Sequence, residues 1–433
     1  MHQPIERRLE LKTRLPLVII ALLAFNELVS PARIWASLLV GTAGVTLVAF
    51  LWARQMRDHV TLRRVTRGTW VTVGDVVSEQ FELVNDALVP VLWAEVVDLS
   101  TVPGYNASQV VACDAQSSYA WQTKGTCRRR GVYTLGPTEV SLGDPFGFFR
   151  VVQRYGDVET ILVYPKVMRL PALQLPRGAA IGRTRSTLRA QERTLLAATV
   201  REYQPGDSLS RIHWRSSAHR GELMVKEFDR ELSGNLWIVL DLDESVHVGS
   251  GEESTLEYGV ILAASLAAQH LQSGERRSVG LVAFGAEEAL LVPHAGQEQL
   301  WRILRALAAA QASSHWSLER VLAAAEPSME RGQTIIVITP STDPAWISPL
   351  LPLKQKGLSP AVLLIDPGSF NGREPHEDRV MGLRGLLAEH GIVSHVIQQG
   401  FPFEPMIRQV RRRVEYRVLG TGRVVPVVVE EEV

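Results

Sequence analysis

Cysteine is almost absent from this chain of 433 residues, in which Cys113 and Cys127 are the only two. One widely spaced pair without neighbouring histidines is poor spacing for zinc and too sparse for a disulfide-stabilised secreted domain. We therefore predict two unreactive thiols in a reducing compartment. An excess of charge is absent too, because 46 Lys and Arg balance 46 Asp and Glu. No global field favours nucleic acid, and we predict no nucleic-acid partner.

Two apolar runs near the N-terminus predict a membrane anchor over residues 1–58, with transmembrane helices at about 15–29 and 34–52. The second run carries no charge and, as a helix, is long enough to span the roughly 30 Å hydrocarbon core. The first is shorter and carries Asn26 and Glu27 near its end. A cleavable signal peptide or a single anchor is the alternative, although no clean small-residue cleavage site follows the first run.

Basic residues flank the two runs and are scarce between them. Only Arg33 lies in the connector. The flanking residues are Arg7, Arg8, Lys12 and Arg14 before the runs, and Arg54, Arg57, Arg63 and Arg64 after them. The positive-inside rule then places both ends, including everything after residue 54, in the cytoplasm. We predict a multi-pass protein of the inner (cytoplasmic) membrane with its soluble part in the cytoplasm.

The middle of the chain has the short, regularly spaced strands and Gly, Pro and Asn turns that are typical of a β-sandwich, which we place at residues 59–166. Within it, Asp144-Pro145 and Gly147 predict a turn. We expect Phe146, Phe148 and Phe149 beside that turn to pack inward, and a binding loop is the alternative. Residues 167–200 are rich in Gly and Arg without periodicity, which predicts an exposed linker.

Residues 233–400 alternate between continuous apolar runs and helical patterns, which predicts a doubly wound α/β domain with a parallel sheet; residues 401–433 form a tail. Ligands of such sheets bind beyond the carboxyl ends of the strands. This rule singles out Asp241, Asp243, Ser245, Ser313, Ser314 and Asp343 as candidate site residues.

The first of these strand ends resembles the metal site of von Willebrand factor A domains, where a D-x-S-x-S sequence, a Thr and a further Asp hold magnesium. Here Asp241 and Ser245 occupy the outer positions, and Asp243 replaces the first Ser. Pro340 follows Thr339 where the family has its last Asp. The resemblance therefore implies a degenerate Mg²⁺ site, liganded by Asp241 and Ser245 if at all, and we expect no stoichiometric metal. The alternative is that these residues only cap strand-to-helix turns.

Residues 201–232 combine dense charge with turn residues. Ser208 lies in a G-D-S-x-S sequence like that of a serine hydrolase, but no buried strand precedes it and no late Asp-His pair follows. We predict instead a structural clasp: a turn, a helix that is capped by Asp207 or Ser208 and ended by Gly221, then a strand. Trp214 should be buried in it.

The same segment resembles a bacterial family called domain of unknown function 58. The residues that match its pattern are Arg201, Tyr203, Pro205, Gly206, Asp207, Ile212, Trp214, Ala218, Gly221, Leu223 and Glu227. Members combine this block with a membrane hairpin and a von Willebrand-like domain, and resemble proteins encoded beside MoxR-type AAA+ ATPases. The resemblance implies assembly or chaperone-like work with such an ATPase at a bacterial inner membrane, and it supplies no catalytic residue or cofactor.

We therefore interpret the chain as a membrane-anchored scaffold or adaptor that works with the lipid bilayer and a MoxR-type AAA+ ATPase. Two alternatives stay open at this point. One is a hydrolase that uses Ser208 or the acidic strand end at Asp241. The other is a metal-dependent adhesion module, which the positive flanks of the hairpin disfavour.

Overall fold

The structure is a computed structural model, in which the chain splits into two compact units, Met1–Lys166 and Val167–Val433. It describes residues 4–66, 68–171, 199–204, 212–227, 235–272, 277–370, 377–405, 410–418 and 424–432. The prediction of several domains, with an N-terminal apolar helix followed by a β-rich region, is confirmed.

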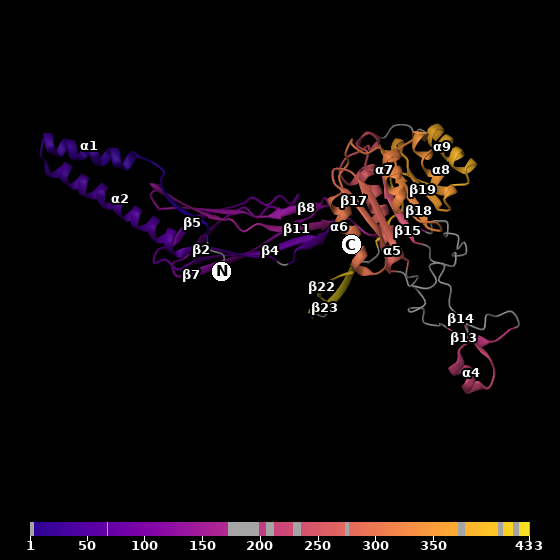
Figure 1. Ribbon diagram of the computed structural model, residues 1–433. Helices are drawn as coiled ribbons and strands as arrows, with labels where there is room; N and C mark the ends of the chain where they lie inside the picture. Colours follow the sequence, from indigo (N-terminus) through magenta and orange to yellow (C-terminus); the bar gives the residue numbers. More distant parts are fainter. Residues whose placement is uncertain are drawn as a thin grey trace. The chain divides into compact units, whose positions relative to one another are not determined.

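The first unit contains two packed helices, α1 (Leu15–Val29) and α2 (Arg33–His59) (Figure 1). Within the described part of the chain, only α2 is both long and apolar enough to cross a membrane, whereas α1 is a shorter apolar helix. Our prediction ended the second helix at residue 52, which is too early. Its last turns bury Ala49, Ala53 and Met56 in the core of the β-rich region, and this packing extends the helix to His59.

A strand precedes the helices, which our assignment of residues 1–58 to an anchor did not predict. Strand β1 (Glu6–Leu11) pairs antiparallel with β10 (Phe149–Tyr155) along its whole length. It is a mostly exposed edge strand with charged residues at four of its six positions, so it lacks the apolar alternation that predicts strands. The chain therefore leaves the β-rich region through α1 and returns to that region after α2.

Strands β1 to β11, which we call the β domain, form a five-stranded sheet in the order β1-β10-β9-β5-β6 and two three-stranded sheets, β2-β4-β7 and β3-β11-β8. The remaining strands are β2 (Val60–Thr66), β3 (Trp70–Thr72), β4 (Val76–Asn85), β5 (Val91–Asp98), β6 (Gln109–Cys113), β7 (Ser117–Thr126), β8 (Gly131–Leu135), β9 (Thr138–Gly143) and β11 (Glu159–Tyr164).

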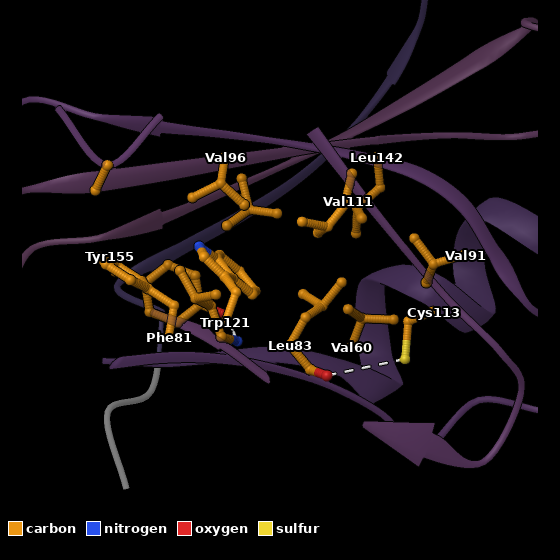
Figure 2. Close-up of a cluster of buried hydrophobic side chains, with 14 of the residues drawn as sticks. Val60, Phe81, Leu83, Val91, Val96, Val111, Cys113, Trp121, Leu142 and Tyr155 are labelled. Atoms are coloured by element: carbon orange, nitrogen blue, oxygen red, sulfur yellow. Dashed lines mark hydrogen bonds between the residues drawn. The ribbon is translucent and has the colours of Figure 1, made fainter. Parts of the chain in front are cut away.

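Two of these sheets enclose a common core. Phe81, Leu83 and Trp121 from β4 and β7 face Val96 and Leu142 from β5 and β9 (Figure 2). The rings of Phe81 and Trp121 stack at 5.5 Å. The two cysteines are buried and free, as predicted, and burial raises the pKa of Cys127 to about 11, which keeps the thiol protonated and unreactive.

A buried ion pair lies at the edge of this core. Arg64 donates to both carboxylate oxygens of Glu79, at 2.8 and 2.7 Å, and to Asp98 at 3.0 Å. The hydroxyl of Tyr105 also donates to Glu79. Burial works to raise the pKa of Glu79, but the hydrogen bonds from Arg64, Tyr105 and Thr66 hold it below its ordinary value. The cluster is therefore ionised inside the fold.

The second unit contains a six-stranded sheet in the order β17-β16-β15-β18-β19-β20, parallel except for β17. Its strands are β15 (Leu236–Leu240), β16 (Val279–Phe284), β17 (Glu288–His294), β18 (Thr334–Thr339), β19 (Ser359–Ile365) and β20 (Val393–Ile397). The five parallel strands lie at the predicted apolar runs. Our prediction omitted β17, because this edge strand is half exposed and lacks a continuous apolar run.

Helices cover both faces of this sheet (Figure 1). They are α5 (Thr255–Gln272), α6 (Gln297–Ala309), α7 (Leu318–Ala325), α8 (Leu350–Gln355) and α9 (Glu377–Glu389). Trp237 and Val239 of β15 point to the face that α7, α8 and α9 cover. Leu240 and Ile338 lie next to Gly259 of α5 on the opposite face.

Short strands occur where we predicted only a linker and a tail. Strand β12 (Met168–Arg169), from the predicted linker 167–200, pairs with β21 (Glu404–Pro405), from the predicted tail 401–433. Later in that tail, β22 (Val410–Val418) and β23 (Val424–Glu432) form an antiparallel hairpin. Residues 172–198 of the predicted linker lie outside the described residues.

Candidate functional site

The candidate site lies where two central strands of the second unit end side by side. Asp241 directly follows β15, and its backbone N–H donates to the carbonyl of Ile338 in β18 at 2.9 Å. Thr339 is the last residue of β18. Because the two strands are parallel neighbours, their carboxyl ends bring Asp241 and Thr339 together.

Hydrogen bonds from the protein engage both carboxylate oxygens of Asp241. Oδ2 accepts a 2.6 Å bond from the Thr339 hydroxyl, and Oδ1 accepts a 3.1 Å bond from the backbone N–H of Asp243. The side chain is almost completely buried. Burial raises the pKa of Asp241 to about 6, although the bonds from Thr339 and Asp243 oppose that rise. The buried Asp241 is thus expected to hold its proton to a higher pH than an exposed Asp does.

A second loop joins the site at Asp243. The backbones of Asp243 and Ser313 form a parallel bridge, and the N–H of Ser313 donates to the carbonyl of Leu242 at 2.9 Å. The carboxylate of Asp243 accepts from both the backbone and the hydroxyl of Ser245, at 3.0 and 2.8 Å. The structure therefore brings Asp241, Asp243, Ser245 and Ser313 together, as the strand-end rule predicted.

Two histidines border the site and were not among our candidates. One ring nitrogen of His247 lies 3.1 Å from the carbonyl of Asp241, and the other lies 3.1 Å from the hydroxyl of Thr255. Nδ1 of His315 lies 2.6 Å from the hydroxyl of Ser313. The sequence offered one signal for them: His315 follows the candidate Ser313 by two residues, and His247 follows the candidate Asp241 by six. In the described part of the chain no carboxylate bonds the His315 ring, so the third group of a catalytic triad is missing there.

Among the described residues, no hydrogen bond joins Ser314 or Asp343 to Asp241. Both are exposed. Asp343 caps a short 3₁₀ helix, Pro344–Ile347, by accepting from the backbone N–H of Ala345 at 3.0 Å. For Asp343 the alternative interpretation, a capping role, describes what its carboxylate does.

The donor set offers little to a hard cation. Among the residues that the structure describes, no three His, Cys, Asp or Glu side chains gather closely enough to hold a metal ion. Asp241, Asp243, Ser245 and Ser313 supply oxygen atoms, which Mg²⁺ prefers. However, the Thr339 hydroxyl donates to Asp241 and the Ser245 hydroxyl donates to Asp243, so both carboxylates are already engaged by protein donors. A cation at this place would have to share these carboxylate oxygens with protein donors.

The predicted clasp forms a separate small element. Strand β13 (Thr199–Glu202) pairs antiparallel with β14 (Met224–Glu227), which places the backbones of Arg201 and Val225 opposite each other. Helix α4 (Trp214–Arg220) lies between the two strands in sequence and ends at Gly221, in the left-handed conformation that favours glycine. The side chain of His213 caps its start by accepting from the backbone N–H of Ser216. Asp207 and Ser208, to which we assigned this role, lie outside the described residues.

The residues that we predicted to form the clasp differ in what the structure shows of them. The burial of Trp214 is wrong, because this side chain is 68% exposed. Ser217 and Ile212 are buried in its place, and the Ser217 hydroxyl accepts from the backbone N–H of Met224 at 2.9 Å. Gly206, Asp207 and Ser208 lie outside the described residues, as do the side chains of Arg201 and Glu227; Tyr203 is half-buried, and its backbone N–H donates to the carbonyl of Leu223.

Comparison with known families gives a match for this part of the chain. Residues 199–369 match the family model described as "Protein of unknown function DUF58". The chain contains a DUF58 domain. The match begins at β13 and ends after β19, so it includes both the clasp and the Asp241 strand end.

Curated relatives carry no functional names. The chain is 28% identical over 213 residues to the "Uncharacterized protein YeaD" of Bacillus subtilis, covering 48% of this chain and 50% of that protein. It is 28% identical over 174 residues to the "Uncharacterized protein Rv1480" of Mycobacterium tuberculosis, covering 39% of this chain and 54% of that protein. The chain thus spans about half the length of these relatives.

Among solved structures, the CARDB domain of PF1109 from Pyrococcus furiosus matches 24% of this chain and 94% of its own length. The identity is 10% and the TM-score is 0.18. A likeness of this size gives no information about function.

Proposed function

We propose that this chain is a membrane-anchored scaffold or adaptor. In this proposal the α1–α2 hairpin holds it in a bacterial inner membrane, and the DUF58 domain contacts a protein partner in the cytoplasm. The second unit would be a von Willebrand factor A-like domain, an assignment supported by the antiparallel edge strand β17 and by the Asp241–Ser245 sequence at the strand end. No catalytic residue is proposed.

The anchor is supported by the apolar surface of the hairpin and by its attachment at both ends. Leu17, Leu22, Val40 and Leu47 are among its many exposed apolar side chains, which a bilayer would cover. Because β1 before the hairpin and β10 after it share a sheet, the chain must enter and leave a membrane on the same side. With α2 crossing the bilayer, α1 would complete a second crossing.

The partner surface is supported by one observation above all. Exposed polar side chains surround the buried carboxylate of Asp241, and donors of the protein already bond both of its oxygens. Asp241 is bonded by Thr339 and Asp243, whereas Ser245, Ser314 and Asp343 are exposed on the loops around it. Strand-end loops vary without harm to a core and commonly carry binding residues. The resemblance to proteins encoded beside MoxR-type AAA+ ATPases supplies the partner we propose.

The test is a pull-down of the full chain from membranes with two matched pairs of substitutions. Asp243→Ala with Asp343→Ala changes the strand-end surface without touching the buried Asp241. Glu330→Ala with Glu389→Ala removes two exposed acids that precede β18 and β20, at the end of the sheet where its parallel strands begin.

We expect an AAA+ ATPase to be retained by the parent chain and by the control pair, and to be lost from the strand-end pair while its melting temperature stays within a few degrees. An ATPase bound equally by all three proteins would exclude this surface. An eluate of the parent chain that contains no ATPase would exclude the partner. Turnover of an ester or phosphate substrate that depends on Asp241 or Ser208 would favour the hydrolase.

A further inference from the structure

We propose that the end of the β domain beside the helical hairpin is itself a lipid-binding surface, which contacts the interface of an anionic bilayer through the loop tips Leu88 and Phe146. We call this surface the rim; it consists of loops 86–90 and 144–148 with Lys12, Arg14 and Arg54. The inference rests on the membrane anchor proposed above and deepens it, because it assigns a membrane contact outside the helices.

Loop 144–148 holds its aromatic tip, Phe146, in a fixed position. The buried carboxylate of Asp144 accepts from the backbone N–H of Phe146 at 2.8 Å and from that of Phe149 at 2.5 Å. Gly147 takes a left-handed conformation and donates to the carbonyl of Asp144. Phe149 is buried as predicted, but Phe146 is 48% exposed and stacks on Phe148. The hydrogen bonds of the buried Asp144 carboxylate therefore fix a loop in which the Phe146 ring is exposed.

This loop lies beside the base of the hairpin. The carbonyl of Phe148 accepts from the backbone N–H of Lys12 at 2.8 Å, and Lys12 lies two residues before Arg14, which directly precedes α1. The next ring, Phe149, packs edge-to-face on Phe50 of α2, with ring centroids 5.7 Å apart. Phe50 stands near the end of the exposed apolar surface of α2, and Arg54 follows one turn later. The rim thus continues the apolar surface of the hairpin at the level where charge begins.

Loop 86–90 is likewise held in place by a buried polar side chain. The side chain of Asn85, completely buried, donates to the carbonyls of Val89 and Asp114 and accepts from the backbone N–H of Ala87. Between these fixed points Leu88 is 72% exposed. The loop adjoins the end of α2, because the backbone N–H of Asp86 donates to the carbonyl of His59 at 3.0 Å.

Charge completes the argument for lipid. Lys12, Arg14 and Arg54 are exposed around the base of the hairpin, where headgroups of a bilayer would lie, and Arg54 is also 4.0 Å from the carboxylate of Asp58. Basic side chains at that level attract anionic headgroups, and aromatic side chains favour the interface. A protein partner has no comparable support, since the rim borders the surface that a bilayer would already cover.

The experiment places one cysteine-linked, environment-sensitive label at a time on the full chain in nanodiscs of phosphatidylethanolamine and phosphatidylglycerol. The native Cys113 and Cys127 are buried, and they are replaced by Ala in the parent if they react. The rim variants are Phe146→Cys and Leu88→Cys. The control is Val158→Cys, which is 51% exposed and follows the opposite end of the same strand, β10. Val40→Cys reports on the hairpin.

We expect lipid-borne quenchers to reduce the emission from positions 146 and 88 at least twofold more than that from position 158, with position 40 quenched most. Labels at 146 and 88 that are quenched no more than the label at 158, while 40 is quenched, would overturn the rim and leave the anchor intact. If position 40 also behaves as water-exposed, the anchor itself fails. Replacement of the phosphatidylglycerol by phosphatidylcholine should weaken quenching at the rim without changing it at position 40; equal quenching in both lipids would overturn the anionic assignment.

Discussion

The hydroxyl of Thr339 donates a 2.6 Å hydrogen bond to the carboxylate of Asp241, linking the ends of two neighbouring parallel strands. This contact engages one of the two carboxylate oxygens of Asp241, and both side chains are buried. It makes Asp241 part of the fold as well as the centre of the proposed partner surface.

Asp241→Asn should change how stability depends on pH. The pKa of Asp241 is about 6 in the folded chain, above the value near 4 of an unfolded Asp. Its contribution to stability is therefore complete below about pH 4 and is lost as pH rises through about 6, a loss of roughly 3 kcal/mol for two pKa units. The Asn variant lacks this titration. Urea unfolding at pH 4 and pH 7.5 should show the parent losing more stability than the variant, and parallel losses would contradict the assignment.

Arg64→Met should destabilise the β domain by about 3–5 kcal/mol, because it leaves the carboxylate of Glu79 buried without its partner. The matched control is the adjacent Arg63→Met. It breaks an exposed pair with Glu82, 3.6 Å apart, and should cost less than about 1 kcal/mol.

The loss of stability at acid pH gives an independent check on the pair of Arg64 and Glu79. The contribution of Glu79 is present above its unfolded pKa and is lost as pH falls through its lower folded pKa. Since Arg64→Met removes the donor that lowers this pKa, the variant should lose less further stability between pH 5 and pH 3 than the parent. Equal slopes in thermal melts would show that Arg64 does not set the pKa of Glu79.

Trp214→Ala should change the free energy of unfolding by less than about 0.5 kcal/mol, because the ring is exposed. Ser217→Ala is the internal comparison. It removes an acceptor for the Met224 backbone in a buried place and should cost about 1–3 kcal/mol. A stable Trp214→Ala protein that no longer retains its partner would assign the indole to binding. A large loss of stability would show that the ring is covered in the assembled protein.

The hairpin should place its tip on the far side of the membrane from both of its ends. In cells, Ser30→Cys should react with a membrane-impermeant maleimide from outside, and Val158→Cys should react only after the membrane is opened. Ser30 follows α1 directly, and Val158 belongs to the β domain. Labelling of both positions from the same side would contradict a double crossing.

The sequence predicted what depends on local pattern and missed what depends on distant pairing. The run around Ile238 is apolar at every position because both faces of its strand are covered, so it was recognisable. Strand β1 depends on β10 for its pairing, and no local pattern reveals it. Likewise Asp241 was found from its place at a strand end, whereas its bond to Thr339 joins residues far apart in the chain. Trp214 was misplaced because large aromatic side chains are usually buried.

The pairing of β1 with β10 also imposes an order on the synthesis of this protein. Residue 149, where β10 begins, comes 149 − 11 = 138 positions after the end of β1. At roughly 5–20 residues per second, the first strand waits on the order of ten seconds for its partner. The apolar hairpin leaves the ribosome during that interval. In the membrane-anchored state proposed above, delivery to the bilayer would therefore precede closure of the sheet, and the β domain would finish folding against an anchor that is already in place.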